Sequence, residues 1–241
     1  MLHSPVAAIA ANRSNNWSGY NRGALQANVN VFHSISGNWT VPAATQHQKG
    51  QAEQSSTWIG IGGGCLDAAC SAADPTLIQL GTEQDVGKTG KASYSAWWEL
   101  VPAPSTTITS LKIHRGDRIH AVLSEAVTGS NVWTMTLRDV TTGKSWSQTV
   151  PYTSTHATAE WIEETPLGIG TGGVGLSAMP DLSLVRFDHA TLNGAPAHFK
   201  AAEQIHLVQG RAVATPSKPD PDHDGFNVCT YRKTCPAPKS S

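Results

Sequence analysis

Short segments of alternating apolar and polar residues, separated by turn signals, run through the chain. Examples are Leu77–Val86, Ala92–Val101 and Gln204–Val208, with turns such as His114–Asp117 and Val140–Lys144 between other segments of this kind. No amphipathic helix of useful length interrupts the pattern. A period of two places successive side chains on opposite faces of a strand. Many short strands joined by turns indicate an all-β, antiparallel β-sandwich.

Length and composition favour one main domain. The chain has 241 residues with 39% hydrophobic content, enough for a substantial core in a single sandwich. Only 15% of residues are charged, and eight Trp against four Phe and four Tyr suit an extracellular all-β protein. A formal net charge of -1 gives no indication of a nucleic-acid partner or an anionic membrane surface. No apolar run is long enough to span a bilayer.

The domain organisation follows from shifts in composition. We expect a flexible small-residue leader over 1–13, the β-sandwich domain over 14–212, and a Pro- and Asp-rich C-terminal segment with a disulfide loop over 213–241. The first eleven residues lack the cationic start and long apolar stretch of a signal peptide, so we expect a start from which a targeting segment has been removed. A Gly-rich loop over 168–175 is expected to be flexible backbone near a cleft.

The four cysteines form two close pairs, Cys65/Cys70 and Cys229/Cys235. Of the three possible connectivities, local pairing is the simplest in an oxidising compartment, and it indicates a secreted, extracellular protein. A metal site with four cysteine ligands or free buried thiols are the alternatives, although neither pair has the tight spacing that is usual for zinc.

Three carboxylates fall in one strand-like stretch that runs from Ala159 to Pro166. In a strand Glu160 and Glu164 share one face, whereas Glu163 lies on the other. We interpret this stretch as a catalytic strand. The alternative for the stretch taken alone is an edge strand whose inward charges discourage aggregation.

Other strands also place polar groups beside large aromatic side chains. Trp97 and Glu99 share a face, Gln79 and Glu83 share another, and Trp58 lies opposite two isoleucines. Such a face suits a cleft for a polymer, because aromatic rings supply contact area and a few polar groups supply orientation.

Six motifs carry a resemblance to a known family. In chain order they are Asn16-Trp17-Ser18-Gly19-Tyr20, Gly37-Asn38-Trp39-Thr40-Val41-Pro42, Trp58-Ile59-Gly60-Ile61, Leu77-Ile78-Gln79-Leu80-Gly81, Tyr94-Ser95-Ala96-Trp97-Trp98-Glu99 and Ala159-Glu160-Trp161-Ile162-Glu163-Glu164. Each is weak alone, but the six in this order resemble the glutamic peptidases, or eqolisins, from about Asn16 to Val208. The resemblance implies a sandwich of two large antiparallel sheets of the jelly-roll type, similar to legume-lectin and glucanase folds. It also implies a secreted endopeptidase that acts in acid.

The resemblance further implies a set of site residues. The catalytic pair corresponds to Gln79 and Glu164, and the cleft positions that bind substrate correspond to Trp17, Trp58, Trp97 and Glu99. Fungal members carry Asp at two positions where this chain has Gly62 and Ser95, so the resemblance favours a non-fungal member with fewer acids around the pair. We therefore expect the acid limb of its activity profile to approach a single titration.

The chemistry of such a pair follows from general principles. Peptide hydrolysis needs an activated water, stabilisation of the oxyanion and a proton for the leaving amine. The Glu164 carboxylate can take the proton of the water and return it to the nitrogen, and the Gln79 amide can donate to the oxyanion. A carboxylate base remains competent in acid, where a histidine base would be protonated.

Two other functions fit parts of the same pattern. A glycoside hydrolase could use Glu160 and Glu164, although four residues of strand separate their backbones by roughly 13 Å, more than paired carboxylates in such enzymes usually allow. A non-catalytic carbohydrate-binding module would also explain a face lined by Trp. We expect protein or peptide substrates, no nucleic-acid or membrane partner, no cofactor and a monomer.

Metal binding has one weak sequence signal. Asp220, Asp222 and Asp224, followed by a glycine, match the start of a calcium loop, but Tyr231 stands where a bidentate Glu is wanted. A structural calcium site and a solvated acidic turn therefore both stay open, and the catalytic site is expected to hold no metal. The ten His show no zinc-type spacing. Two glycosylation sequons, at Asn16 and Asn38, lie in expected strands and are expected to stay unmodified.

Overall fold

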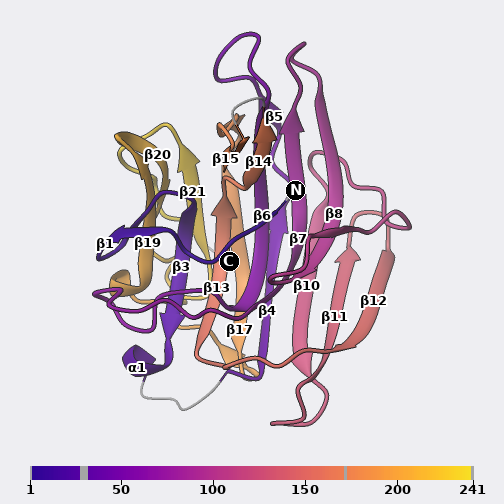
Figure 1. Ribbon diagram of the computed structural model, residues 1–241, viewed down its shortest axis with the longest axis vertical. Helices are drawn as coiled ribbons and strands as arrows, with labels where there is room; N and C mark the ends of the chain where they lie inside the picture. Colours follow the sequence, from indigo (N-terminus) through magenta and orange to yellow (C-terminus); the bar gives the residue numbers. More distant parts are fainter. Residues whose placement is uncertain (1, 28–31, 171–172, 240–241) are drawn as a thin grey trace.

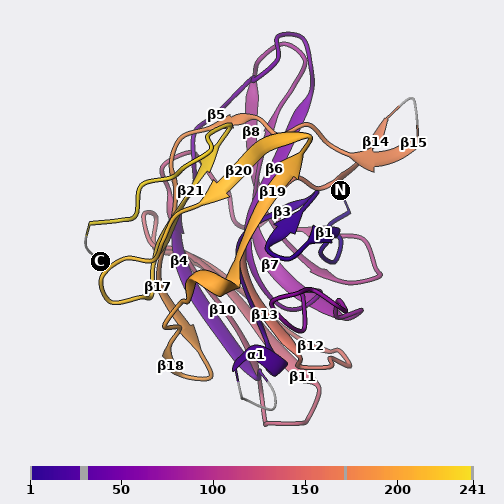
Figure 2. The same cartoon turned by 90° about the vertical axis from the view of Figure 1, so that its left-hand side faces the viewer.

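The computed structural model describes residues 2–27, 32–170 and 173–239. Two large sheets pack face to face in these residues, as Figure 1 and the perpendicular view in Figure 2 show. The fold is an all-β antiparallel sandwich, as predicted from the sequence, and the two helical pieces are one turn each: α1 (Ala24–Ala27) and the 3-10 helix η1 (Ala201–Glu203). No helix within these ranges is long and apolar enough to cross a membrane.

The two sheets have simple orders of neighbouring strands. The first sheet runs β9 (Thr106–Thr107), β8 (Ala92–Leu100), β7 (Leu77–Val86), β6 (Glu53–Gly62), β13 (Thr158–Glu164) and β3 (Trp17–Gly23). The second runs β12 (Lys144–Pro151), β11 (Val132–Asp139), β10 (Arg118–Glu125), β4 (Ser34–Thr40), β17 (Val185–Leu192), β21 (Phe226–Thr230) and β20 (Arg211–Pro216). Smaller strands are β1 (Ala8–Ala10), β2 (Arg13–Ser14), β5 (Ala44–Thr45), β14 (Leu167–Gly170), β15 (Gly173–Leu176), β16 (Asp181–Leu182) and β18 (Ala195–Pro196).

One strand belongs to both sheets. β19 (Gln204–Gln209) pairs with β3 of the first sheet and with β20 of the second, both antiparallel. It also pairs with the short β2 in the parallel sense. The sandwich is therefore joined by backbone hydrogen bonds along one side.

The core between the sheets is built from the inward faces of these strands. Tyr20, Ile59, Leu80 and Trp161 of the first sheet are fully buried there, and Trp39 of the second sheet packs into the same cluster. Burial of large apolar side chains is the main source of stability for such a sandwich. The inward set follows the period-two alternation of the sequence.

A second, smaller apolar cluster lies on the outer face of the first sheet. It contains Trp17, Trp58, Trp97 and Ile162, all of them buried. Gly81 stands between Trp58 and Trp97 in the strand register. A Cβ at this glycine would lie 2.5 Å from the Cβ of Trp58. The glycine thus makes room for two indole rings on neighbouring positions.

Most expected strands are present with small changes at their ends. The prediction for Leu77–Val86 is confirmed without change, and Gln204–Val208 is one residue short of β19. The Gly-rich stretch over 168–175 is not simply a loop, because β14 and β15 form an antiparallel hairpin there, which projects from the sandwich in Figure 2. Thr171 and Gly172, between the two strands in sequence, lie outside the described residues.

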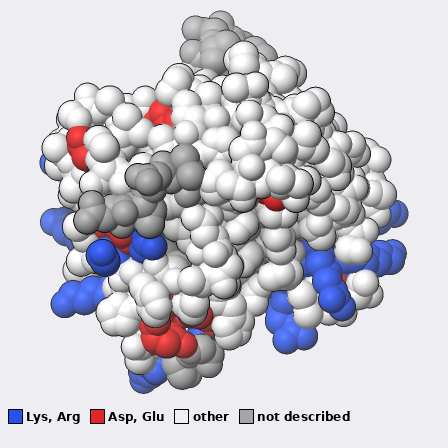
Figure 3. Space-filling view, turned by 90° about the horizontal axis from the view of Figure 1, so that it is seen from below, with Lys and Arg blue, Asp and Glu red and all other residues white. Residues whose placement is uncertain are grey.

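The two ends of the chain contact the sandwich. Leu2 forms a bridge with Leu167, and the dark N-terminal chain in Figure 1 crosses in front of the first sheet towards β1. The boundary expected between 212 and 213 falls inside β20, which lies in the second sheet together with β21. Figure 3 shows one face of the molecule, where charged side chains of both signs are scattered among uncharged ones.

Candidate active site

The sequence-predicted site residues share the outer face of the first sheet. In the strand register Glu164 lies opposite Trp17 on one side and Ser56 on the other, while Gln79 lies opposite Glu99. Residues directly opposite one another on neighbouring strands point to the same face, and so do residues an even number of positions apart on one strand. The strand register relates all these residues in one of these two ways, so their side chains lie on the same face of the sheet. The structure therefore brings the predicted set to one face, over the outer apolar cluster.

Glu164 is fully buried and has donors on both carboxylate oxygens. The indole N–H of Trp58 donates to Oε2 at 2.9 Å. The ring of His3 contacts the same oxygen through Nδ1 at 2.9 Å, and the backbone N–H of Ser4 donates to Oε1 at 3.4 Å. These contacts fix the position and orientation of the Glu164 carboxylate.

Gln79 is also fully buried, and only one of the two polar atoms of its side chain has a hydrogen-bond partner. Its Nε2 donates to Oε2 of Glu99 at 2.8 Å, while its Oε1 has no partner. Burial raises the pKa of Glu99 to about 7, and the negative charge of Glu164 acts in the same direction, against the lowering effect of His3. No hydrogen bond joins Gln79 and Glu164 within the described ranges. The contacts between them run through Glu99 and His3.

The other two acids of the same strand have different surroundings. Glu160 is fully buried beside Gly64, where a Cβ would lie 2.3 Å from Oε1 of Glu160, and burial raises its pKa well above the usual value. Glu163 points to the opposite face, accepts a hydrogen bond from Thr57 at 2.6 Å, and has a pKa that burial raises to about 8. Glu160 therefore does not share the hydrogen-bond partners of Glu164, which disfavours a paired-carboxylate glycosidase.

The remaining predicted cleft residues form the walls. Trp17 meets Trp58 edge to face with ring centroids 5.0 Å apart, and its indole N–H has no partner. Trp97 donates its indole N–H to Ser56 at 2.9 Å. These buried rings belong to the outer apolar cluster and give the carboxylates an apolar surrounding.

Gly62 and Ser95 occupy the two positions at which fungal members of the family carry Asp. Gly62 has φ +95°, and a Cβ there would lie 2.0 Å from the carbonyl oxygen of Thr76. The backbone therefore requires glycine at this position. Ser95 donates to Glu83 at 2.9 Å, so a polar link remains at the second position.

The hydrogen bonds and ion pairs around the site include four residues that were not among the predicted site residues: His3, Ser4, Asn16 and Glu83. His3 and Ser4 belong to a stretch expected to be flexible, and no periodic pattern marks them. Glu83 shares its strand face with Gln79, and that spacing was the signal that could have identified it. Asn16 belongs to the first family motif, and its side chain bonds the backbone of Ala7 and Pro5.

The comparison with protein families decides what this site belongs to. The model of the Peptidase A4 family matches residues 15–229 of the chain. The protein is a member of the Peptidase A4 family. It is therefore a glutamic endopeptidase, and the resemblance found in the sequence is confirmed. Among curated proteins there is no significant match.

Solved structures of glutamic peptidases share the fold of this peptidase. A crystal structure of scytalido-glutamic peptidase with a peptide-based transition state analog matches with a TM-score of 0.65 and 19% identity, over 90% of this chain and 98% of that chain. SCP-B, a member of the eqolisin family, in a complex with a tripeptide Ala-Ile-His matches with 0.61 and 19%, over 90% and 98%. Aspergilloglutamic peptidase from Aspergillus niger matches with 0.57 and 24%, over 74% and 99%.

Both expected disulfides are present in this peptidase. Cys65 bonds Cys70, and Cys229 bonds Cys235, so the local connectivity is confirmed. The alternatives of a four-cysteine metal site and free thiols are wrong.

Three groups of side chains among the described residues could hold a metal away from the predicted pair. Asp220, Asp222 and Asp224 place one carboxylate oxygen each within 4.8 Å of one another, and burial raises the pKa of Asp220. His33, Glu125 and His156 form a similar group, in which His33 Nδ1 lies 2.6 Å from Glu125 Oε2. The third group is Asp188, His189 and Asp224. None of the three shares a residue with the candidate active site. Calcium at the aspartates stays a prediction.

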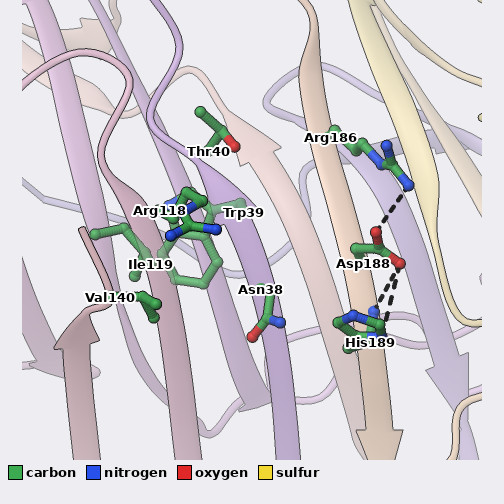
Figure 4. A pocket seen from close by; sticks show the side chains of 9 residues that line it. All are labelled: Asn38, Trp39, Thr40, Arg118, Ile119, Val140, Arg186, Asp188 and His189. Atoms are coloured by element: carbon green, nitrogen blue, oxygen red, sulfur yellow. Dashed lines mark hydrogen bonds and ion pairs between the residues drawn. The ribbon is translucent and has the colours of Figure 1, made fainter. Parts of the chain in front are cut away.

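A separate hollow of about 270 Å³ lies on the second sheet. The residues that line it, drawn in Figure 4, are Asn38, Trp39, Thr40, Arg118, Ile119, Val140, Arg186, Asp188 and His189. Arg186 and Asp188 form an ion pair at 2.8 Å. The hollow contains none of the predicted site residues, so it is not the candidate active site.

Proposed function

We propose that this peptidase is a secreted, monomeric enzyme that cleaves proteins in acid, with Glu164 as the base and Gln79 as the oxyanion donor. The observation that carries the proposal is the position of Glu164. It is a fully buried carboxylate on the Trp-lined face that Gln79 shares, and an indole N–H holds it. The family match independently supports peptide hydrolysis at such a pair.

Glu164 performs the proton transfers in this proposal. Its carboxylate removes a proton from a water molecule as that water attacks the scissile carbonyl carbon. The protonated Glu164 then returns the proton to the amide nitrogen as the carbon–nitrogen bond breaks. The indole N–H of Trp58 fixes the carboxylate at 2.9 Å while it changes charge. The same group thus serves as base and then as acid.

Gln79 stabilises the oxyanion, and Glu99 sets its orientation. In the structure Nε2 of Gln79 is turned towards Glu99, and Oε1 is left without a partner. Because burial raises the pKa of Glu99 to about 7, this carboxyl carries a proton in acid. A neutral Glu99 can donate to Oε1 of Gln79, and the amide turned by 180° then directs Nε2 at the substrate. Acid thereby prepares the oxyanion donor.

Secretion and a peptide substrate have separate support. The two disulfides of this chain are typical of oxidising compartments outside the cytosol. Similar folds have been solved with a peptide-based transition state analog and with a tripeptide, each bound to its own protein. Aromatic walls around a few polar groups fit an extended peptide in the same way.

The proposal is tested by hydrolysis of an acid-denatured protein such as casein between pH 2 and 8. We expect turnover in acid that resists both pepstatin and a chelator, with Glu164→Gln protein as the inactive control. Reducing-sugar release from polysaccharides is measured in parallel. Sugar release without peptide cleavage would refute the proposed function.

A further inference from the structure

Four aspartate side chains from two parts of the chain gather on the second sheet. Asp220, Asp222 and Asp224 lie in the loop between β20 and β21, and each places a carboxylate oxygen within 4.8 Å of the others. Asp188 of the neighbouring strand β17 joins them, because it forms a second group of this kind with His189 and the same Asp224. Carboxylates this close repel one another, and a cation between them turns the repulsion into attraction.

The backbone brings Asp188 to this loop. Phe187 stands opposite Phe226, the first residue of β21, so Asp188 lies beside the end of the loop. The register between β17 and β4 shifts just after Asp188, and the N–H of Ala190 donates to the carbonyl of Asp224 at 3.0 Å. Bulges in a ladder re-aim side chains and are frequent beside functional sites. The loop and the shifted part of β17 are thus held against each other.

Asp220 is the most buried of the four. Only 3% of its surface is exposed, and its Oδ1 accepts the backbone N–H groups of Asp224 and Gly225, each at 3.1 Å. Its Oδ2 has no hydrogen-bond partner among the described residues. A buried carboxylate oxygen without a partner is costly. A solvated acidic turn does not account for this oxygen, whereas a bound cation does.

Oxygens from the loop and from β17 converge beside Gly225. A Cβ at this glycine would lie 2.2 Å from Oδ2 of Asp220, 2.9 Å from the carbonyl oxygen of Phe187 and 3.1 Å from Oδ1 of Asp188. In the described part of the chain, Oδ1 of Asp224 is a further buried oxygen without a hydrogen-bond partner. Calcium binds carboxylate and carbonyl oxygens in sets of this kind, and its loops need a glycine at the sharp turn.

Arg186 and His189 balance part of the charge of these carboxylates. The Arg186 guanidinium pairs with Oδ2 of Asp188 at 2.8 Å, and Nδ1 of His189 lies 4.0 Å from oxygens of Asp188 and Asp224. Figure 4 shows Asp188 between the two basic side chains. Four carboxylates and one guanidinium together carry a net charge of -3 while His189 is neutral. A divalent cation would offset most of that charge.

We propose that β17 and the loop before β21 together hold one calcium ion, with four carboxylate ligands: Asp188, Asp220, Asp222 and Asp224. The loop has the spacing of the first half of a calcium loop, and Gly225 stands at its turn position. Asp188 replaces the closing acid that Tyr231 cannot supply. The ion fastens the loop and β21 to β17. The site shares no residue with the candidate active site, so the inference is independent of the proposed function.

The first test measures the thermal midpoint Tm at pH 7 after a chelator has removed bound metals. Calcium at about 10 mM should raise Tm by at least about 3 °C, because a ligand that binds only the folded state stabilises it. Magnesium at the same concentration should raise Tm less, since it gives up its water reluctantly and prefers a smaller shell. No rise with calcium, or equal rises with both ions, would overturn the calcium site.

The second test counts bound ions by isothermal titration calorimetry at pH 7. We expect one calcium per chain with a Kd of about 10⁻⁵ to 10⁻³ M, and at least about tenfold weaker binding in Asp220→Asn and in Asp188→Asn. Asp181→Asn, at a side chain that is 47% exposed and outside the cluster, is the matched control and should bind as the unaltered protein does.

The variants separate the two halves of the site. Unchanged binding in Asp220→Asn would refute the whole site, and unchanged binding in Asp188→Asn would refute the ligand from β17. Circular dichroism checks the fold of each protein. If Asp220→Asn does not fold, Asp222→Asn at the exposed end of the loop takes its place, with the same expected loss.

The third test locates the ion by amide hydrogen exchange with calcium and with a chelator. Calcium should slow exchange at least about tenfold in residues 217–230 and 185–190, and leave β7 and β13 unchanged. A uniform change, or none in these two segments, would refute the fastening role. The kcat on a reporter peptide should be the same in both solutions. Loss of cleavage in the chelator, in folded protein, would place the ion in catalysis and contradict the inference.

Discussion

The indole N–H of Trp58 lies 2.9 Å from Oε2 of Glu164, and both side chains are fully buried. In the pairing of β6 with β13, Trp58 stands opposite Ile162, which is two residues before Glu164. Trp58 and Glu164 are therefore diagonal neighbours on the same face of the sheet. A neutral donor from the next strand thus fixes a carboxylate without adding a charge. A carboxylate held this way can take up and release a proton without moving, which is what general acid–base catalysis requires.

Removal of either member of the predicted pair should abolish peptide hydrolysis. Gln79→Ala removes one oxyanion donor, for which a loss of about 10²- to 10³-fold in kcat is typical. Glu164→Gln removes the base and should cost more. Steady-state kinetics on a reporter peptide, with circular dichroism to check the fold, measures both. Glu160→Gln is the control and should have a milder effect, and full activity in folded Glu164→Gln protein would exclude this assignment.

Trp58→Phe should lower kcat with little change in KM. The substitution keeps an aromatic ring in the cluster but deletes the donor to Glu164. Hydrogen bonds to charged groups contribute about 1.5 to 3 kcal/mol, so a loss of about 10- to 100-fold is expected. Trp17→Phe is a suitable comparison, because the indole N–H of Trp17 has no partner. If the two variants lose the same activity, the hydrogen bond is not the cause.

Glu99→Gln should extend activity towards neutral pH. In the unaltered protein the pKa of Glu99, raised to about 7 by burial, means that the carboxyl loses its proton as the pH rises through that value. The carboxylate then holds Nε2 of Gln79, as the structure shows at 2.8 Å. A glutamine at 99 stays neutral, so the alkaline limb of kcat should move up. The profiles of Glu99→Gln and of the unaltered protein are recorded on the same reporter peptide, and an unmoved limb would contradict the role of Glu99.

The fold should be more stable in mild acid than at pH 8. Burial raises the pKa of Glu163 to about 8, above its value in an unfolded chain. The folded state then binds the proton more tightly, so its stability is present below about pH 4.5 and is lost as the pH rises towards 8. By this linkage the loss is on the order of 2 to 4 kcal/mol. Chemical denaturation against pH measures it, and Glu163→Gln should flatten the curve.

A second acid, Glu125, should lower the stability of the fold at strongly acidic pH. Burial tends to raise the pKa of Glu125, but backbone donors from Gly129 and Asn131 and the ring of His33 lower it to about 2. Its contribution is present above about pH 4.5 and is lost as the pH falls towards 2. Stability should therefore peak in mild acid. A maximum at pH 8 would contradict the assignment of Glu163, and a stability that does not fall between pH 4.5 and 2 would contradict that of Glu125.

Reduction of the disulfides should destabilise the fold only modestly. The bonded cysteines are 5 and 6 residues apart in sequence, so each bond closes a short ring. By the chain-entropy argument each ring contributes about 2 kcal/mol. Thermal unfolding with and without a reductant measures the change. Unfolding at room temperature on reduction would show that the rings do more than restrict the unfolded chain.

Much of the fold was predictable because its strands follow a strict alternation. The pair Gln79 and Glu164 came from family motifs, and the structure places both on one face, as the period of two requires. β20 and β21 escaped prediction because they are short and flank a segment rich in Pro and Asp. Their pairing is a tertiary effect that no local pattern carries.

The least predictable parts of the site depend on contacts distant in sequence. His3 lies in a stretch without periodicity, yet it contacts Glu164, which is 161 residues away. Gly62 was interpreted as a lost acid, but its φ of +95° and the close carbonyl of Thr76 show a backbone requirement. Gly62→Asp would therefore strain the backbone and cannot test the acid limb. Ser95→Asp alone is the usable variant.

The strand that belongs to both sheets governs where the molecule can open. β19 is hydrogen-bonded to β3 on one side and to β20 on the other, so separation of the sheets there would break two sets of backbone bonds. The opposite side ends in β9 and β12, which pair with one neighbour each. Amide hydrogens should exchange with solvent fastest along that side and slowest near β19. Transient opening of this peptidase is thus directed away from the strand that carries Glu164, which lies beside β3.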